Sequence, residues 1–362
     1  MLLHNLEKKE LINPPTWLCS NTQYLTVMGS QAYGVSTDNS DLDIYGVTIP
    51  PRHQIFPHEA GIIDGFDKQV QKFKNWQQHH IKDKTVNGGK GQEYDFSIYG
   101  IINYFRQCAD CNPNVVDSLF VNRESIIHIT QAWEEVRKNR KSFLHKGLAH
   151  KCRGYAFGQL KDAKNCEPYV SGIRKFEDEY KIPHSTTYND FNNYCCPEIV
   201  TENQKRVNEL YNLHGFKFIE QYGRFWDEGF SKTKRFESQK IHNTDVKSLY
   251  HVFRLADQAE QMLTEHDLDL QKKSRREKMK AIRRGEYTYD QVVAEFGEQE
   301  KRINNLYQTS KLRYSPNEEA IKNLLLTVLE HHFGSIDKAF KGENRYQKAL
   351  LEIKDVCRKF GV

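Results

Sequence analysis

The chain has 362 residues, which is long enough for two domains and a buried core without disulfides or a structural metal. Hydrophobic residues make up 38% of it and charged residues 28%, and no apolar run approaches the roughly 18 to 20 residues of a membrane-spanning helix. The net charge of +5 is mild, and the N-terminus lacks the basic-then-apolar order of a signal peptide. We therefore expect no membrane segment and a cytoplasmic location, in the host if the chain is viral.

The first apolar run extends from Tyr24 to Met28 and ends at Gly29, which predicts a buried strand. A tight turn should then begin a short helix with Ser30 at or near its N-cap. Backbone N–H groups and the helix dipole favour an anion there. Gly29 has no side chain, so the backbone could approach a phosphate closely.

A second strand is predicted from Leu42 to Ile49. Side chains two residues apart on a strand point to the same face, so Asp41 and Asp43 should project together. Such a pair is suited to a divalent cation, because Mg²⁺ prefers oxygen ligands. A site with two metals needs a third carboxylate on a neighbouring strand.

The predicted strand from Glu93 to Ile98 supplies that third carboxylate as Asp95. Asp95 is assigned as the third carboxylate by its place in a strand, and not by a distinctive motif. Glu93 lies two residues earlier on the same face and is the alternative.

A polar segment, 68–92, precedes this strand and carries His79 and His80. Its glycines lack the Gly-Lys-Ser/Thr ending of a Walker motif, so we expect a mobile loop with solvated histidines. After the strand, residues 101–108 have helical periodicity, and the Asn-Pro-Asn sequence at 112–114 ends that helix.

From about residue 125 onward, strand signals nearly vanish and the pattern becomes helical. The predicted fold class is therefore α+β, with a small mixed sheet and helices followed by a mainly helical region. We expect a catalytic domain at 1–124 and a helical region for substrate and nucleotide binding at 125–362. Residues 165–200 are rich in Tyr, Asn, Pro and Cys, which predicts an irregular insertion.

Helices are predicted at 202–218 and 245–263. In the second, Lys247, His251 and Arg254 lie four and three residues apart and so share one helical stripe. A solvated basic face is the ordinary explanation for such a stripe. The alternative is a binding site for a triphosphate, which needs cations beyond those that its metals supply.

The most basic segment is 271–284, with eight Lys or Arg residues against one acid. A solvated helix and an RNA-binding track beside the active site both explain such a composition. The residues of that track would be Lys272, Lys273, Arg275, Arg276, Arg283 and Arg284.

A Gly-Ser turn, ten further residues and then Asp-x-Asp, with a strand on either side, resembles the DNA polymerase β nucleotidyltransferase superfamily. Four landmarks resemble more narrowly the nucleotidyltransferase family that is often associated with RNA ligases: Met28–Gly46, Asn112–Asn114, Lys247–Leu255 and Ile282–Tyr287. The resemblance implies a polymerase-β-like domain with a helical extension, which uses a nucleoside triphosphate with two Mg²⁺ ions or with Mn²⁺. It also implies RNA end repair or modification, in a pathway shared with an RNA ligase.

On this resemblance Asp41, Asp43 and Asp95 hold the metals, while Gly29 and Ser30 bind the terminal phosphates. The predicted reaction transfers a nucleoside monophosphate to an RNA end, for which tRNA is a candidate. The same site would also serve AMPylation-type transfer to a hydroxyl of a protein or a small molecule. A third alternative is a catalytically silent module that binds nucleotide or RNA, although such a module has no need of several mutually repelling carboxylates.

Overall fold

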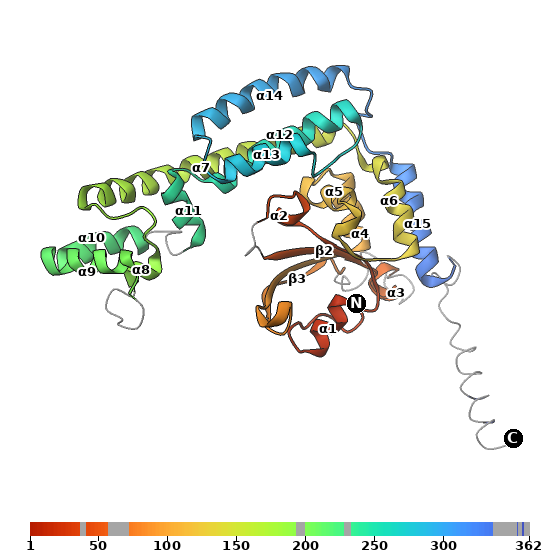
Figure 1. The fold of residues 1–362 in the computed structure, drawn as a ribbon. Coiled ribbons are helices and arrows are strands. Elements are labelled where there is room, and N and C mark those ends of the chain that lie inside the picture. Colours follow the sequence, from red (N-terminus) through yellow and green to blue (C-terminus); the bar gives the residue numbers. More distant parts are fainter. Residues whose placement is uncertain are drawn as a thin grey trace, which may run out of the picture. The chain divides into compact units, whose positions relative to one another are not determined.

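The computed structural model describes residues 1–36, 41–56, 72–192, 200–227 and 233–335, together with Ile353 and Cys357. The chain divides into two compact units, and Figure 1 labels most of their helices and two of the strands. The first unit consists of Met1–Leu148, Glu265–Gln271 and Lys311–Val362, and the second of Ala149–Thr264 and Lys272–Ser310.

The first unit is built on a five-stranded sheet with the strand order β3-β4-β2-β1-β5. Strands β2 and β4 pair in parallel, and the other neighbouring pairs are antiparallel. The mixed sheet confirms the predicted α+β class. The strands are β1 (Thr22–Val27), β2 (Leu42–Thr48), β3 (Asn75–Asp83), β4 (Gln92–Gly100) and β5 (Ile126–Ile129).

Helices lie on both faces of this sheet (Figure 1). The helices of the first unit are α1 (Leu2–Lys8), α2 (Gly29–Ala32), α3 (Arg52–Ile55), α4 (Ile101–Ala109), α5 (Pro113–Phe120), α6 (Gln131–Lys138) and α15 (Glu318–Phe333), of which α15 packs on α4 and α6. Leu3 and Leu6 of α1 share a buried cluster with Ile44 of β2 and Phe96 of β4. Because side chains alternate along a strand, the neighbours of Ile44 and Phe96 in sequence point to the opposite face.

In the described part of the second unit, every regular element is a helix. The helices are α7 (Gly147–Tyr180), α8 (Tyr188–Asn192), α9 (Glu202–His214), α10 (Phe216–Asp227), α11 (Lys234–His242), α12 (Val246–Glu265), α13 (Lys273–Arg283) and α14 (Tyr289–Thr309). An aromatic cluster that includes Phe176, Phe218, Tyr222 and Trp226 forms a core. None of the described helices in either unit has the length and apolar content needed to cross a bilayer.

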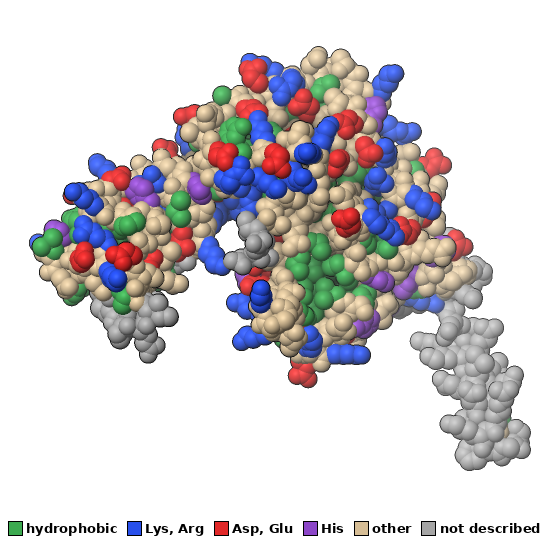
Figure 2. Space-filling view, in the orientation of Figure 1, with side chains coloured by type: hydrophobic (Ala, Val, Ile, Leu, Met, Phe, Trp, Pro, Cys, Tyr) green, Lys and Arg blue, Asp and Glu red, His purple; other side chains and the backbone are tan. Residues whose placement is uncertain are grey.

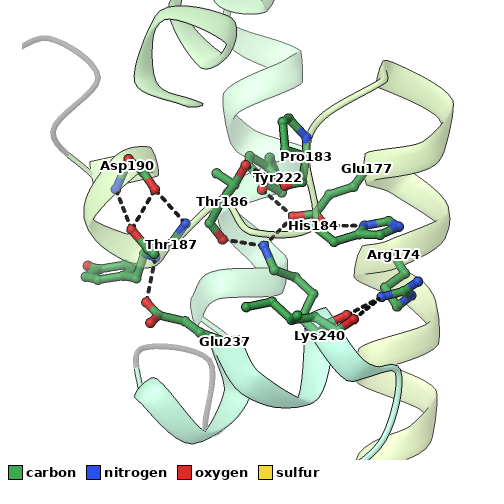
Figure 3. Close-up of polar contacts among 12 residues, drawn as sticks. Arg174, Glu177, Pro183, His184, Thr186, Thr187, Asp190, Tyr222, Glu237 and Lys240 are labelled. Atoms are coloured by element: carbon green, nitrogen blue, oxygen red, sulfur yellow. Dashed lines mark hydrogen bonds and ion pairs between the residues drawn. The ribbon is translucent and has the colours of Figure 1, made fainter. Parts of the chain in front are cut away.

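A buried polar network joins α7, α10 and α11 and is drawn in Figure 3. The Lys240 ammonium donates to Glu177 Oε1 at 2.5 Å and to the carbonyl oxygen of Thr186. The Tyr222 hydroxyl donates to the same Glu177 oxygen at 2.6 Å, and His184 Nδ1 lies 2.9 Å from the other oxygen. Both charged side chains are fully buried, and burial lowers the pKa of Lys240 despite the attraction of Glu177. The internal partners of both charges identify the network as a structural element.

The strongest local patterns in the sequence are confirmed. Strands occupy the predicted sites at 24–28, 42–49 and 93–98, and helices occupy 101–108, 202–218 and 245–263. The helix predicted at 202–218 is divided at Gly215, which has φ of +70° and ends α9. A positive φ is readily adopted by glycine, so the chain turns there and begins α10.

The prediction of a loop over 68–92 is wrong for residues 75–83, which form strand β3 with His79 and His80 inside it. This strand lies at the edge of the sheet, and most of its side chains are polar and not buried, so the hydrophobic alternation is weak. Strand β5 also lies after residue 125, although the sequence predicts a helical region from about that residue onward.

The prediction of an irregular insertion at 165–200 is wrong for its first part, because residues 165–180 continue α7 with Pro168 inside the helix. Proline normally ends a helix, which explains the prediction. Residues 193–199 of the segment lie outside the described residues. The domain boundary after residue 124 stays a prediction.

Candidate active site

Acidic side chains lie at the end of the sheet where β2 and β4 pair in parallel. Asp43 of β2 is in register with Asp95 of β4. Paired residues on adjacent strands point to the same face, and such strands are about 4.8 Å apart, so these two carboxylates project side by side. Asp41 is exposed directly before β2. If the register is continued by one residue, Asp41 lies next to Glu93.

The contacts of Glu93 and Asp95 distinguish the two candidates for the third carboxylate. Glu93 already has partners, since His80 Nδ1 lies 2.7 Å from its Oε1 and Lys82 Nζ lies 3.8 Å from its Oε2. Asp95 instead accepts a hydrogen bond from the backbone N–H of His80 at 2.7 Å and lies opposite Asp43. The hydrogen bond to Glu93, together with the charge of Asp95, raises the pKa of His80. These contacts favour Asp95 as the third carboxylate.

A β-bulge in β3 faces Asp95. The pairing of β3 with β4 shifts register between Gln78 and Ile81, so His79 and His80 together oppose this one residue. His80 has φ of +57°, which is uncommon for a residue with a Cβ atom. The two histidines therefore border the acidic site. They lie in a strand and not in the predicted loop, but their side chains are exposed, as predicted. A strand, a Gly-rich turn and a second strand form a hairpin pattern that could have placed them there.

Gly29 lies directly against the Asp43 carboxylate. Its φ is +59°, and a Cβ atom added to it would come within 1.8 Å of Asp43 Oδ2. The adjacent Met28 N–H donates to the Asp43 carbonyl at 2.7 Å, which ties the turn to β2. Ser30 follows Gly29 inside the short helix α2, whose N-cap is Met28. Glycine is therefore required here to make room for Asp43, a reason that the sequence alone did not reveal.

The donor atoms at this end of the sheet suit a hard divalent cation. Proteins commonly bind Mg²⁺ with one or two carboxylates, and substrate phosphates and water complete its coordination. Asp43 and Asp95 supply such a pair. Within the described ranges, no three acidic, His or Cys side chains converge closely enough to hold a metal ion by themselves. The residues thus fit a cation that is shared with a bound substrate.

The predicted triphosphate-binding stripe lies on α12 of the second unit. Lys247 is exposed, His251 is half-buried and Arg254 is buried. Burial lowers the pKa of His251 well below its usual value, and the nearby charges of Arg254 and Lys247 lower it further. The lowered pKa favours the neutral form of His251, so the lasting positive charges of the stripe are those of Lys247 and Arg254. Binding of a triphosphate by these residues stays a prediction.

The predicted RNA-binding track lies on and around α13. Arg275 is buried, forms an ion pair with Asp257 and donates to Gln261 at 2.8 Å, so it packs inside the unit. Figure 2 shows Lys and Arg side chains gathered near α13, with acidic side chains among them. The members of the track that are exposed or half-buried are Lys272, Lys273, Arg276, Arg283 and Arg284.

Comparison with known proteins gives a match for the N-terminal part of the chain. Residues 3–171 match the family model described as the RNA repair pathway DNA polymerase beta family. A segment of 159 residues is 22% identical to an uncharacterised 38.9 kDa protein from the nrdC-mobD intergenic region of Enterobacteria phage T4. That similarity covers 43% of this chain and 38% of the phage protein. No solved structure matches the chain significantly.

Proposed function

We propose that this chain transfers a nucleoside monophosphate from a nucleoside triphosphate to an RNA end. The proposal starts from residues 3–171, a polymerase-β-like nucleotidyltransferase segment that resembles the RNA repair family. The observation that carries the proposal is the pairing of Asp43 with Asp95 across β2 and β4. Adjacent carboxylates repel each other, and a cation between them removes that cost. The adjoining Gly-Ser turn begins α2, whose backbone N–H groups could bind a phosphate beside the carboxylates.

In the proposed reaction Asp43 and Asp95 would hold Mg²⁺, for which Mn²⁺ could substitute, and Asp41 lies directly before β2. When bound, the metal would lower the pKa of the acceptor hydroxyl and neutralise the charge of the leaving pyrophosphate. Two ions would together serve both roles. The turn at Gly29 and Ser30 orients the donor. Because Gly29 lies against Asp43, a phosphate held by this turn lies beside the carboxylates.

Binding of RNA is proposed for the basic residues of the second unit. Lys272, Lys273 and Arg276 are exposed or half-buried, as RNA phosphates require of their partners. Arg275 is left out of this proposal, because its guanidinium is buried against Asp257. Contacts between phosphates and such residues release counterions, so the affinity for RNA should fall steeply as salt rises. The family description, which names RNA repair, supports RNA as the acceptor, with tRNA as one candidate.

The test is to incubate the protein and Mg²⁺ with each α-labelled nucleoside triphosphate, alone and with total RNA, tRNA or cell lysate. We expect label on RNA, and no label with the Asp43→Asn or Asp95→Asn variant. Asp110→Asn is the matched control, because Asp110 is an exposed carboxylate of the same unit outside the site. Label on protein or on a small molecule would replace RNA as the acceptor. Nucleotide binding without any labelled product would instead identify a binding module.

A further inference from the structure

The bulge in β3 holds His80 in a left-handed conformation, with φ of +57°. This conformation is costly for a residue with a Cβ atom, and it persists only where surrounding contacts impose it. Packing of the His80 side chain does not impose it, because 78% of that side chain is exposed. The contacts that the bulge makes are those of the His80 ring with Glu93 and of the His80 backbone with Asp95, and the backbone contact is the one that reaches the paired carboxylates.

The backbone N–H of His80 donates to Asp95 Oδ1 at 2.7 Å. This N–H would serve the ladder in a regular strand, and the bulge redirects it to a side chain instead. The His79 ring lies 3.7 Å from the same Oδ1. Both of these contacts involve Oδ1, so they fix the carboxylate by one oxygen and present Oδ2 to a ligand.

The bulge also gives the two acidic residues of β4, Glu93 and Asp95, different partners. The His80 ring and Lys82 both lie near the Glu93 carboxylate. Asp95 is held by a backbone group, whose position does not depend on a rotamer. A carboxylate held in this way loses little conformational freedom when it binds a cation, which is the usual benefit of hydrogen bonds to metal ligands.

We propose that the β3 bulge is a positioning device for the third carboxylate of the active site. The His80 N–H fixes Asp95 Oδ1, so that Oδ2 is presented to a divalent cation shared with Asp43. His80 is thus a positioning residue, and it acts through its backbone conformation rather than through its imidazole. This inference rests on the proposed function, because it requires Asp43 and Asp95 to bind a cation.

Two variants that both lack the imidazole test the proposal. Glycine adopts positive φ without strain, so His80→Gly should keep the bulge, whereas the β-branched side chain of His80→Val opposes it. Binding of Mn²⁺ to the full chain is measured by the paramagnetic resonance signal of the free ion. We expect H80G to bind Mn²⁺ as the unaltered protein does, and H80V to bind about 10-fold more weakly, as is typical when a residue supporting a metal ligand is lost.

The same variants in an Asp95→Asn background separate positioning from general damage. H80V should cause no further loss of Mn²⁺ affinity there, because its effect passes through Asp95. A loss that persists in this background, or equal affinities for H80G and H80V, would overturn the inference. If H80V does not fold, His80→Ala takes its place, since alanine also disfavours positive φ, and the expected order of affinity is then glycine above alanine.

The Asp43→Asn variant distinguishes failure of this inference from failure of the proposed function. If D43N binds Mn²⁺ as tightly as the unaltered protein, the proposed metal site is wrong. If D43N weakens Mn²⁺ binding while the two His80 variants bind alike, the site stands and only the positioning role is lost.

Discussion

Asp95 in the first unit and Glu177 in the second are two carboxylates in contrasting surroundings. Glu177 is fully buried, and Lys240, Tyr222 and His184 lie within 2.9 Å of its oxygens. Asp95 is 23% exposed, and among the described residues its nearest contacts are the N–H of His80 and the His79 ring. Charge that the protein balances internally holds elements together. Charge that is oriented but not balanced in this way is available for a ligand.

The largest effect is expected from Asp43→Asn. The rate of nucleotidyl transfer should fall on the order of 10³-fold, since a neutral amide is a poor ligand for the cation that stabilises the transferring phosphoryl group. The midpoint of thermal unfolding should stay the same or rise, because repulsion from Asp95 is removed. Single-turnover transfer and a thermal melt measure the two quantities. A rate within tenfold of that of the unaltered protein would show that Asp43 does not hold a catalytic cation.

The second largest effect is expected from Lys240→Met, because this variant leaves Glu177 buried without its cation. The free energy of unfolding should fall by about 3–5 kcal/mol, the usual result of removing one partner of a buried ion pair. Urea unfolding measures the loss. Adding Glu177→Gln to this variant should restore part of the stability, because the uncompensated charge is then gone. A loss below about 1 kcal/mol would show that the network does not hold the second unit together.

The variant Gly29→Ala should weaken both Mn²⁺ binding and transfer by about 10- to 100-fold, the range seen when support of a metal ligand is disturbed. The added Cβ atom would displace the Asp43 carboxylate. Gly88→Ala is the matched control, because Gly88 also has positive φ, at +65°, but has open space around it. Both variants introduce backbone strain, so equal Mn²⁺ affinities would mean that the contact with Asp43 has no functional role.

The smallest effect is expected from Asp83→Asn. Hydrogen bonds from Lys9 and Thr85 lower the pKa of Asp83 from 3.8 to about 2. The ionised carboxylate therefore stabilises the fold above about pH 4, and this stabilisation disappears as the pH falls toward 2. D83N should be less stable than the unaltered protein at pH 7 and equally stable near pH 2, as measured by urea unfolding. Its Mn²⁺ affinity should be unchanged, because Asp83 already has a cationic partner.

The sequence predicts most of the strand-turn-strand at Gly29 and Asp43, because alternation and turn chemistry are local patterns. The bulge at His79 and His80 depends on the register with β4, which no local pattern records. The contact between Gly29 and Asp43 likewise exists only once β2 is folded beside the turn. Lys240 and Glu177 are 63 residues apart in the chain, so their pairing was beyond sequence reasoning. The sequence therefore offers candidate side chains for the site, but the contacts that orient or neutralise each charge required the structure.

A Mn²⁺ titration tests most directly whether Asp43 and Asp95 share a cation. It compares the unaltered protein with the Asp43→Asn, Asp95→Asn and Asp110→Asn variants. If Asp43 and Asp95 share a cation, each of the first two substitutions weakens binding by about tenfold or more, and D110N binds as the unaltered protein does. Equal affinity in all four proteins would contradict the assignment of the active site to this end of the sheet.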